Sequence, residues 1–450
     1  MQTESSHAET LSVNVSHVSS EQRIKALALI QQLKTEDLEL LNQSVQELLQ
    51  IAPDVLPVLI EALVSTDDEI RKNIAWVLGF LQAPQTIKPL LHIMSTDSNV
   101  DVRLSASWAL RQMNLKLLSA VLFTKLSPPE SLDDIKAYIL SKSWKARWYC
   151  TVFLILHPEF ELLEPLMALA RSDENSVVRC SAIMSLSAYS NQRIPPFLTE
   201  LLHDINDYVK IEAASVLSLK NYREALPELA KQLQAYNENV RVSMIAAIGA
   251  LGDASSVHSL AQSLKDPVDM VRINAAIAIF DIAQRIKRPH KLIRDLCLKA
   301  LKDKNVYVVK NAARTLGLVG DEETLREIIT MLKQETRPDI ISNLIQAIGL
   351  FKDKRSIKIL SKFLRHPQWE VRFEVVRALG LLLDGEKEAY PLLLQGMKDP
   401  SLMVKEQAIH AIGLIGNPKA IHHLEQMKMQ HPYGKINETI NKALDRLLGL

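Results

Sequence analysis

The residue types that most often carry chemistry are sparse in this 450-residue sequence. Its three cysteines, Cys150, Cys180 and Cys297, lie far apart, and no pair has the spacing of a metal-ligating or redox motif. We expect Cys150 to be packed at a small-residue core position and Cys180 to lie exposed at a variable one, with no catalytic partner for either thiol. The simple inference from this cysteine usage is a reducing compartment, so we expect a cytoplasmic protein.

The one adjacent histidine pair is His422-His423. Neighbouring residues on a helix point about 100° apart, so these two imidazoles cannot easily share a metal ion. The sequence also contains no Gly-rich phosphate loop, no paired carboxylate motif and no serine nucleophile elbow. We therefore predict no catalytic residue, no metal site and no cofactor, and we expect that the protein is not an enzyme.

Aromatic side chains are the other candidates, because tryptophan and tyrosine are enriched at the centres of protein-binding surfaces. Only 5% of the residues are aromatic, and five of them are tryptophans, so each one is informative. Trp76, Trp108, Trp148 and Tyr149 fall in successive copies of one repeated pattern. Their interpretation therefore depends on the elements that position them.

A short pattern recurs along most of the chain. An aliphatic residue is followed by Arg or Lys, two variable residues, two small or apolar residues, one variable residue, and then a small residue, Leu and often Gly. Most copies are 31 to 33 residues apart, with two longer intervals of 44 and 37 residues. The copies begin at Ile70-Arg71, Val102-Arg103, Ala146-Arg147, Val178-Arg179, Val209-Lys210, Val240-Arg241, Val271-Arg272, Val308-Val309, Ile340-Ile341, Val371-Arg372 and Val404-Lys405. Such a period is typical of a solenoid.

Each period contains two amphipathic helices. In the second copy, apolar residues at spacings of three and four mark one helix around Leu90 and another around Ala106. A polar turn at residues 96–99 separates them, and glycines such as Gly252, Gly320 and Gly416 close second helices because glycine tolerates the left-handed conformation. One such pair cannot bury its apolar stripe alone, so neighbouring pairs must stack around a continuous core.

The pattern resembles the short HEAT-like repeats named after phycobilisome lyases, over roughly residues 54–416. The resemblance implies an all-α, right-handed α-solenoid of about eleven helical hairpins with helical caps. We expect a disordered polar tail at 1–20, without the apolar core of a signal peptide, an N-terminal helical cap at 21–53 and a C-terminal helical cap at 417–450. Apolar runs are too short to span a bilayer, so we predict no membrane span.

The basic residue of the pattern has a structural interpretation. This position is Arg or Lys in nine of the eleven copies, and Asp stands six residues before it in six of the eleven. These aspartates are Asp97, Asp173, Asp204, Asp266, Asp303 and Asp399. The resemblance implies a ladder between repeats, in which an acidic turn meets a buried Arg stem, rather than an electrostatic binding stripe. Val309 and Ile341 replace the basic residue in the eighth and ninth copies, and we expect the ladder to be interrupted there.

Variable positions of the second helices identify the candidate binding surface. Asn73, Trp76 and Phe80 share one helix face, which the resemblance implies is the inner, concave face. The position of Trp76 is taken along the chain by Trp76, Trp108, Val152, Met184, Ser215, Ala246, Ile277, Arg314, Gln346, Arg377 and His410. The candidate partner-binding residues are Trp76, Phe80, Trp108, Trp148, Tyr149, Met184, Arg314 and Arg377. The alternative is that the aromatic rings pack against neighbouring helices or the insert that follows.

Two inserts and an uneven charge mark further candidate surfaces. The insert at residues 111–134 is either a docking lobe or an extra helix that patches a break in the stack. The insert near 284–292 is basic, and it is either a solvated loop or a surface for an acidic partner. Residues 1–283 carry 24 basic and 33 acidic side chains, whereas residues 284–450 carry 29 and 19, although the formal net charge is only +1. Either the two parts present different surfaces, or the charge drifts among solvated faces.

These observations favour an interaction scaffold or adaptor that binds a protein or peptide partner on its concave face. A second interpretation is a bilin lyase subunit or a chromophore-handling chaperone, although no bilin motif is separable from the repeat itself. A third is a nucleic-acid-binding HEAT-like protein, which the acidic, aromatic first part disfavours and the basic second part supports. The sequence identifies neither the partner nor the oligomeric state.

Overall fold

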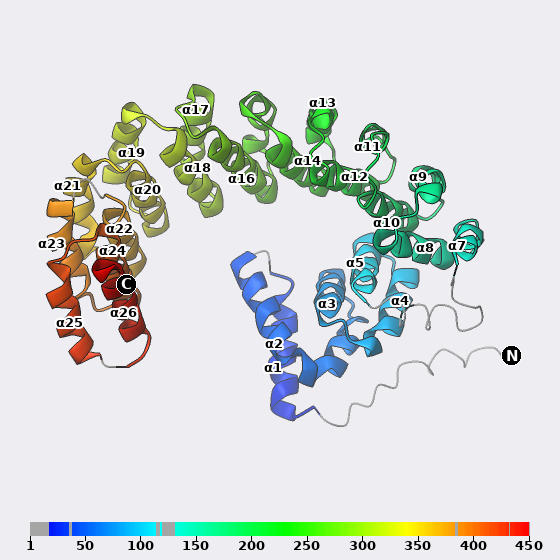
Figure 1. Cartoon of the computed structure of the whole chain (residues 1–450), viewed down its shortest axis with the longest axis horizontal. Coiled ribbons are helices and arrows are strands. Elements are labelled where there is room, and N and C mark those ends of the chain that lie inside the picture. Colours follow the sequence, from blue (N-terminus) through cyan, green and yellow to red (C-terminus); the bar gives the residue numbers. More distant parts are fainter. Residues whose placement is uncertain are drawn as a thin grey trace. The chain divides into compact units, whose positions relative to one another are not determined.

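The computed structural model describes residues 18–35, 38–113, 118, 131–382, 386–431 and 433–449. Its secondary structure consists of helices and short 3-10 turns, and no strand occurs in this described part of the chain. The chain forms two compact units, Met1–Val216 and Leu217–Leu450, and each is described by itself (Figure 1). The predicted all-α solenoid class is confirmed.

Unit 1 is built from helical hairpins that pack one after another. Its helices are α1 Ser20–Gln32, α2 Leu38–Ala62, α3 Asp68–Leu81, α4 Ile87–Thr96, α5 Val100–Arg111, α7 Leu132–Ile139, α8 Trp144–Leu156, α9 Leu163–Ser172, α10 Ser176–Leu186, α11 Ile194–Leu201 and α12 Asp207–Leu219. Short 3-10 turns at Pro84–Thr86 and Phe160–Leu162 lead into α4 and α9.

Unit 2 repeats the same arrangement. Its helices are α13 Leu226–Lys231, α14 Glu238–Leu251, α15 Val257–Leu260, α16 Asp269–Ile286, α17 Lys291–Ala300, α18 Val306–Val319, α19 Glu322–Gln334, α20 Pro338–Leu350, α21 Ile357–Leu360, α22 Trp369–Leu379, α23 Glu386–Gly396, α24 Leu402–Ile415, α25 Ala420–Gln430 and α26 Lys435–Leu448. Its 3-10 turns are Arg223–Ala225, Gln232–Gln234, Ala254–Ser256, Ser263–Lys265, Lys354–Ser356 and Ser361–Arg365.

All eleven copies of the sequence pattern begin in the first turn of a second helix, as predicted. Polar N-caps fix several of these starts, because their side chains accept hydrogen bonds from otherwise unpaired backbone N–H groups. The caps with this bond include Asp67, Asn99, Asn175, Asn237 and Asn305. Second helices such as α3 and α5, α8 and α10, and α14, α16, α18 and α20 pack side by side in one layer of their unit, and the first helices lie in another (Figure 1).

Glycine at the end of the pattern lets consecutive second helices approach closely. A Cβ atom built on Gly79 would lie 2.5 Å from the ring of Trp108, and one on Gly249 would lie 2.9 Å from the Cα atom of Ala278. These distances are too short for a side chain, so only glycine fits without displacing the neighbouring helix. Arg111 and Phe280 occupy the same pattern position in the second and seventh copies, which are the two copies that precede the long intervals.

The glycines that terminate second helices do so in two different ways. Gly416 has a φ angle of 76°, in the left-handed region, as expected. Gly252 and Gly320 instead are extended, so the expectation of a left-handed cap is wrong for both. They are required for another reason, because a Cβ atom at either position would lie 2.5 Å from the carbonyl oxygen four residues earlier.

Parts of the predicted domain map fall outside the described residues, namely 1–17 of the tail and, of the first insert, 114–117 and 119–130. The expected boundary between the N-terminal cap and the repeats falls inside the continuous helix α2. At the second insert, α16 continues to Ile286 and α17 begins at Lys291. Much of the longer interval is therefore extra helix rather than an extended loop.

Candidate functional site

An Arg–Asp ladder connects consecutive repeats. The Arg71 guanidinium donates to both carboxylate oxygens of Asp97, in the next repeat, at 2.8 and 3.0 Å, and to the Ser65 carbonyl oxygen at 2.8 Å. Asp97 also accepts from the backbone N–H of Asn99 at 2.9 Å. The same ion pairs form between Arg147 and Asp173, Arg179 and Asp204, Arg241 and Asp266, Arg272 and Asp303, and Arg372 and Asp399. The predicted ladder is confirmed.

The arginine and aspartate side chains of the ladder are used in contacts within the chain. Burial acts to raise the pKa of Asp97, but the hydrogen bonds from Arg71 and from the Asn99 backbone lower it overall. The carboxylate therefore stays charged and paired at neutral pH. Val309 and Ile341 are buried at the two positions without a basic residue, so apolar packing replaces the ladder there, as expected. The Arg row consequently offers no open binding stripe.

Three aromatic rings meet on the second-helix face of α3 and α5. The ring centroids of Trp76 and Phe80 are 4.8 Å apart, those of Phe80 and Trp108 are 5.2 Å apart, and those of Trp76 and Trp108 are 5.9 Å apart. Trp76 is 40% exposed and Phe80 48% exposed, whereas Trp108 is half-buried. We call these three residues the aromatic cluster. Two contacts are edge-to-face, the arrangement that aromatic quadrupoles favour.

Local sequence explains how the cluster is held. Trp76 and Phe80 are four residues apart on α3, so they lie on one face of that helix. Gly79, between them in sequence, allows α5 to approach until the Trp108 ring lies against the α3 backbone. Trp108 also packs against the core of unit 1. The two exposed rings therefore rest on a third ring that packing fixes in place.

Trp148 and Tyr149 do not extend this surface. Trp148 is 0% exposed, its indole N–H donates to the Ser107 hydroxyl of α5 at 2.9 Å, and Tyr149 is also buried. Both belong to the hydrophobic core of unit 1, together with Val152. The expectation that Trp148 and Tyr149 line an open binding face is therefore corrected. The alternative interpretation, that aromatic side chains pack against neighbouring helices, holds for these two.

Helix α5 is the reason for this burial. It packs against α10, two second helices further along the chain, and not only against its sequence neighbours. Arg111 at its end lies 3.8 Å from Glu212 of α12, and both side chains are largely buried. The Arg111 Nη1 atom has no hydrogen-bond acceptor among the described residues. Burial raises the pKa of Glu212 and Arg111 opposes that shift. We call this pair the α5–α12 contact.

The remaining predicted residues belong to other helices. Met184 is half-buried on α10 in unit 1. In unit 2, the Arg314 guanidinium carbon lies 4.1 Å from the centroid of the Phe280 ring, a cation–π contact. Arg377 forms an ion pair with Glu374 of its own helix at 2.6 Å, so much of its charge is already compensated. That Arg377 contacts a partner stays a prediction.

The cysteines and the histidine pair form no reactive centre. Cys180 is buried, so the expected exposure of this thiol is wrong, and Cys150 is buried as expected. Burial raises the pKa of the Cys150 and Cys297 thiols to about 12, which keeps both protonated at neutral pH. The His423 Nδ1 atom lies 3.3 Å from the Tyr390 hydroxyl. In the described part of the chain, no three His, Cys, Asp or Glu side chains are arranged to hold a metal ion.

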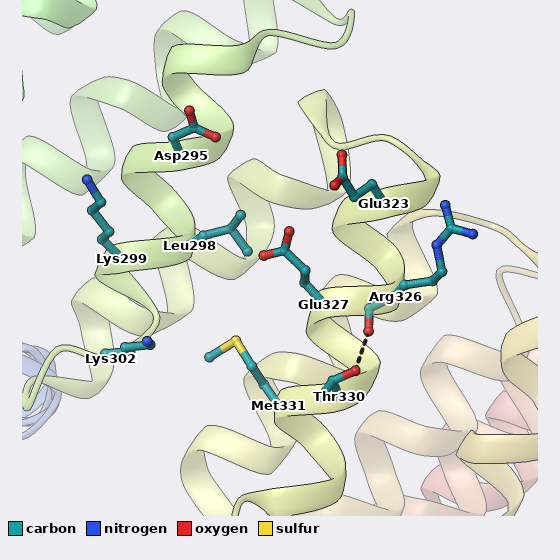
Figure 2. A pocket seen from close by; sticks show the side chains of 9 residues that line it. All are labelled: Asp295, Leu298, Lys299, Lys302, Glu323, Arg326, Glu327, Thr330 and Met331. Carbon is teal, nitrogen blue, oxygen red and sulfur yellow. Dashed lines mark hydrogen bonds between the residues drawn. The ribbon is translucent and has the colours of Figure 1, made fainter.

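A groove of about 680 Å³ lies between the first helices α17 and α19 (Figure 2). Leu298 and Met331 supply its apolar surface, and charged side chains of both signs surround them, including Asp295, Lys299 and Glu327. No nucleophile with an adjacent base is present among the groove's lining residues. Separately, none of the helices in the described residues has the length and apolar character of a membrane span.

Comparison with known proteins identifies the repeat. A family model described as HEAT repeats matches residues 26–111, 137–218, 194–280, 326–395 and 364–434, which together are well over half of the chain. No curated protein matches the sequence.

Several solved structures share the architecture. A structure named Kap95:Nup1 complex has 14% sequence identity and a TM-score of 0.51, over 95% of this chain and 67% of that one. Kap121p has 12% identity and a TM-score of 0.50, over 96% of this chain and 53% of that one. The CpcE–CpcF complex of phycocyanin lyase from Nostoc has 19% identity and a TM-score of 0.34, over 49% of this chain and 94% of that one. At these identities the likeness concerns the fold alone.

Proposed function

We propose, because the chain belongs to the HEAT-repeat family, that it is an interaction scaffold whose unit 1 binds an apolar or aromatic segment of a protein partner. The observation that carries this proposal is the exposure of Trp76 and Phe80 beside the half-buried Trp108. Large apolar surface gathered at one place is costly in water and marks interaction sites more often than scattered apolar residues do.

The aromatic cluster has the physical properties of a binding anchor. The three rings already contact one another, and the missing Cβ atom of Gly79 allows α5 to pack closely on α3. Binding would therefore cost little side-chain conformational entropy. Tryptophan and its neighbours at the centre of an interface contribute most of the affinity in many complexes. A partner segment with Leu, Met, Phe or Pro would bury the two exposed rings without leaving a charge unpaired.

A protein partner also suits the class of fold. Stacked hairpins expose long arrays of second helices and no preformed catalytic cleft, and such repeats are used to bind extended surfaces. One protein of similar fold, Kap95, is seen in complex with Nup1, which supports macromolecular binding as a use of this architecture. We propose that this chain has no catalytic role of its own and that it binds through second-helix side chains.

The test compares the aromatic pair with a matched tryptophan. In the double variant Trp76→Ala/Phe80→Ala, both truncated rings are exposed, so the fold should remain intact. We expect the loss of at least about 2 kcal/mol of binding free energy toward the partner recovered with the wild-type chain. Capture from the native cell with quantitative mass spectrometry identifies that partner, and calorimetry measures the affinity.

Trp369→Ala provides the control, because Trp369 is 39% exposed on α22 and also meets a phenylalanine edge, that of Phe373. It should retain the partner, and both variants should melt near the wild-type temperature. If the double variant binds as the wild type does, or if it unfolds, the aromatic cluster is not the binding site.

A further inference from the structure

A row of basic side chains runs along the second-helix face of unit 2. The position equivalent to Trp76 is occupied by Arg314 in α18, Arg377 in α22 and His410 in α24. Counting from Ile436, the same register in α26 gives Lys442, which is exposed. These helices pack successively through α20, so the row belongs to one layer. We propose that this face binds an acidic segment of a protein partner, anchored on Arg314.

Arg314 is the best-prepared cation of the row. Its guanidinium group stacks on Phe280 of the preceding second helix, which fixes its plane and leaves its N–H edge available. Among the described residues, no carboxylate lies within ion-pair distance of it. Arg285, by contrast, donates to backbone carbonyl oxygens at the end of α14, at 2.8 Å from that of Gly252. A planar donor fork held in this way matches a carboxylate in two hydrogen bonds.

The charges around Arg314 leave an excess of cations. Lys310, one turn earlier on α18, is exposed. Asp281 and Glu374 are acidic groups near this row, and burial raises the pKa of each carboxyl group. Arg285 and Arg314 oppose the shift at Asp281, and Arg377 and Lys310 oppose it at Glu374. Arg377 already pairs with Glu374, so Arg314 and Lys310 are the basic side chains of α18 that remain for a ligand on this side of the pair.

A second group of cations lies at the end of the row. It does not include His410, because burial lowers the pKa of this imidazole and the nearby positive charge of Arg446 lowers it further, which leaves it neutral at neutral pH. Arg446 and Lys442, both on α26, are exposed. An acidic ligand along the row would therefore meet cations from α18 to α26, with the Arg377–Glu374 pair between them.

Apolar side chains on α16 define the rest of the ligand. Met270 and Ile277 are exposed on the helix that carries Phe280. A segment that combines apolar residues with Asp or Glu would cover these two side chains and place its carboxylates on Arg314 and Lys310. A nucleic acid fits less well, because its bases require exposed aromatic faces, and the Phe280 ring is buried beneath Arg314.

The inference rests on the proposed scaffold function but concerns a different surface. The probe is a short fluorescein-labelled peptide that alternates leucine with glutamate, and its control replaces glutamate by glutamine. We expect the full chain to bind the acidic peptide and not the amide peptide in an anisotropy titration. Arg314→Met keeps an apolar stem on Phe280 and should weaken binding by about tenfold or more, because a charge-assisted hydrogen-bonded pair is lost. Arg314→Lys, which retains the charge without the planar fork, should lose part of the affinity.

Arg326→Met is the matched control, since Arg326 is 70% exposed on the first helix α19 and should not affect binding. Trp76→Ala/Phe80→Ala should bind the peptide normally, so failure of the aromatic site and failure of this one are distinguishable. The proposal is overturned if the amide peptide binds equally well, if Arg326→Met weakens binding as Arg314→Met does, or if an oligothymidylate binds more tightly than the acidic peptide.

Discussion

The arginine side chains of this protein differ in whether a carboxylate of the same chain compensates their charge. Ladder arginines such as Arg241 donate two hydrogen bonds to an aspartate of the next repeat and two more to carbonyl oxygens of their own turn. Arg314 has the same functional group, yet it stacks on a ring and contacts no carboxylate within ion-pair distance among the described residues. Residue type alone does not separate these roles, whereas position in the repeat does.

A ladder arginine should be important for stability. In Arg241→Ala, Asp266 loses both side-chain donors in a half-buried site, and the packing of the arginine stem is lost. We expect the free energy of unfolding to fall by roughly 1–3 kcal/mol in a urea titration. Arg355→Ala, at an exposed pair with Glu322, should lose less. Unchanged stability together with loss of partner binding would mean that the ladder row is functional.

The sequence pattern predicts where the second helices begin, but it does not predict the packing of α5 against α10. The pattern predicts the start of every second helix because its apolar residues recur at fixed spacing, and in many copies a capping side chain or a ladder arginine marks the same turn. These are local signals. The aromatic cluster follows from the same register, since Trp76 and Phe80 share one face of a single helix. Near-neighbour spacing cannot predict that α5 packs on α10, because that contact joins elements separated by an irregular interval.

Spacing within one helix also fails to predict the burial of Trp148 and Cys180. Trp148 and Cys180 occupy positions that are variable in other copies, and a single-helix argument predicts exposure. Both are buried because α5 and its residues Ser107 and Arg111 cover that part of the face. Phe280 gives no hint in sequence of its stacking with Arg314, which depends on the packing of α18 beside α16.

Because Cys180 is buried, its rate of alkylation reports how often the α5–α12 contact opens. In Glu212→Ala, Arg111 would keep its charge in a buried site without a counter-ion, which typically costs about 3–5 kcal/mol. We expect α5 to separate from α10 and α12 more often, and alkylation of Cys180 under native conditions to accelerate at least about tenfold. Mass spectrometry of iodoacetamide-treated protein reports each cysteine separately.

Cys297 in unit 2 is the internal control and should remain protected. Replacing both partners, in Arg111→Met/Glu212→Met, should restore protection of Cys180, because two apolar side chains leave no buried charge. A Cys180 rate that does not respond to Glu212→Ala, or that rises only in parallel with that of Cys297, would contradict the contact.

At the scale of the whole molecule, both units use one building plan for different surfaces. Unit 1 presents aromatic rings from α3 and α5, and unit 2 presents cations from α18 to α26 on helices of the same register. The difference in charge between residues 1–283 and 284–450 agrees in sign with this contrast, although its boundary is not that between the units.

The metal content of the whole chain tests our proposal that it has no catalytic role. We expect protein purified from its native cell to contain no stoichiometric iron or zinc, because His422 and His423 are directed toward Gln426 and Tyr390 rather than toward each other. Elemental analysis by mass spectrometry checks this. About one metal ion per chain would refute our interpretation of the histidine pair and reopen the possibility of an enzymatic role.

The pattern glycines limit how such a chain can change its length. Gly79, Gly249 and Gly349 each face a small residue or a ring of the following second helix, so these repeats can be duplicated or removed as units. Arg111 and Phe280 occupy the position of that glycine in their copies. Arg111 lies beside Glu212 of α12, and Phe280 stacks with Arg314 of α18. If either insert alone were deleted, Arg111 or Phe280 would clash with the second helix that then follows. A shortened protein would therefore need a glycine at that position as well.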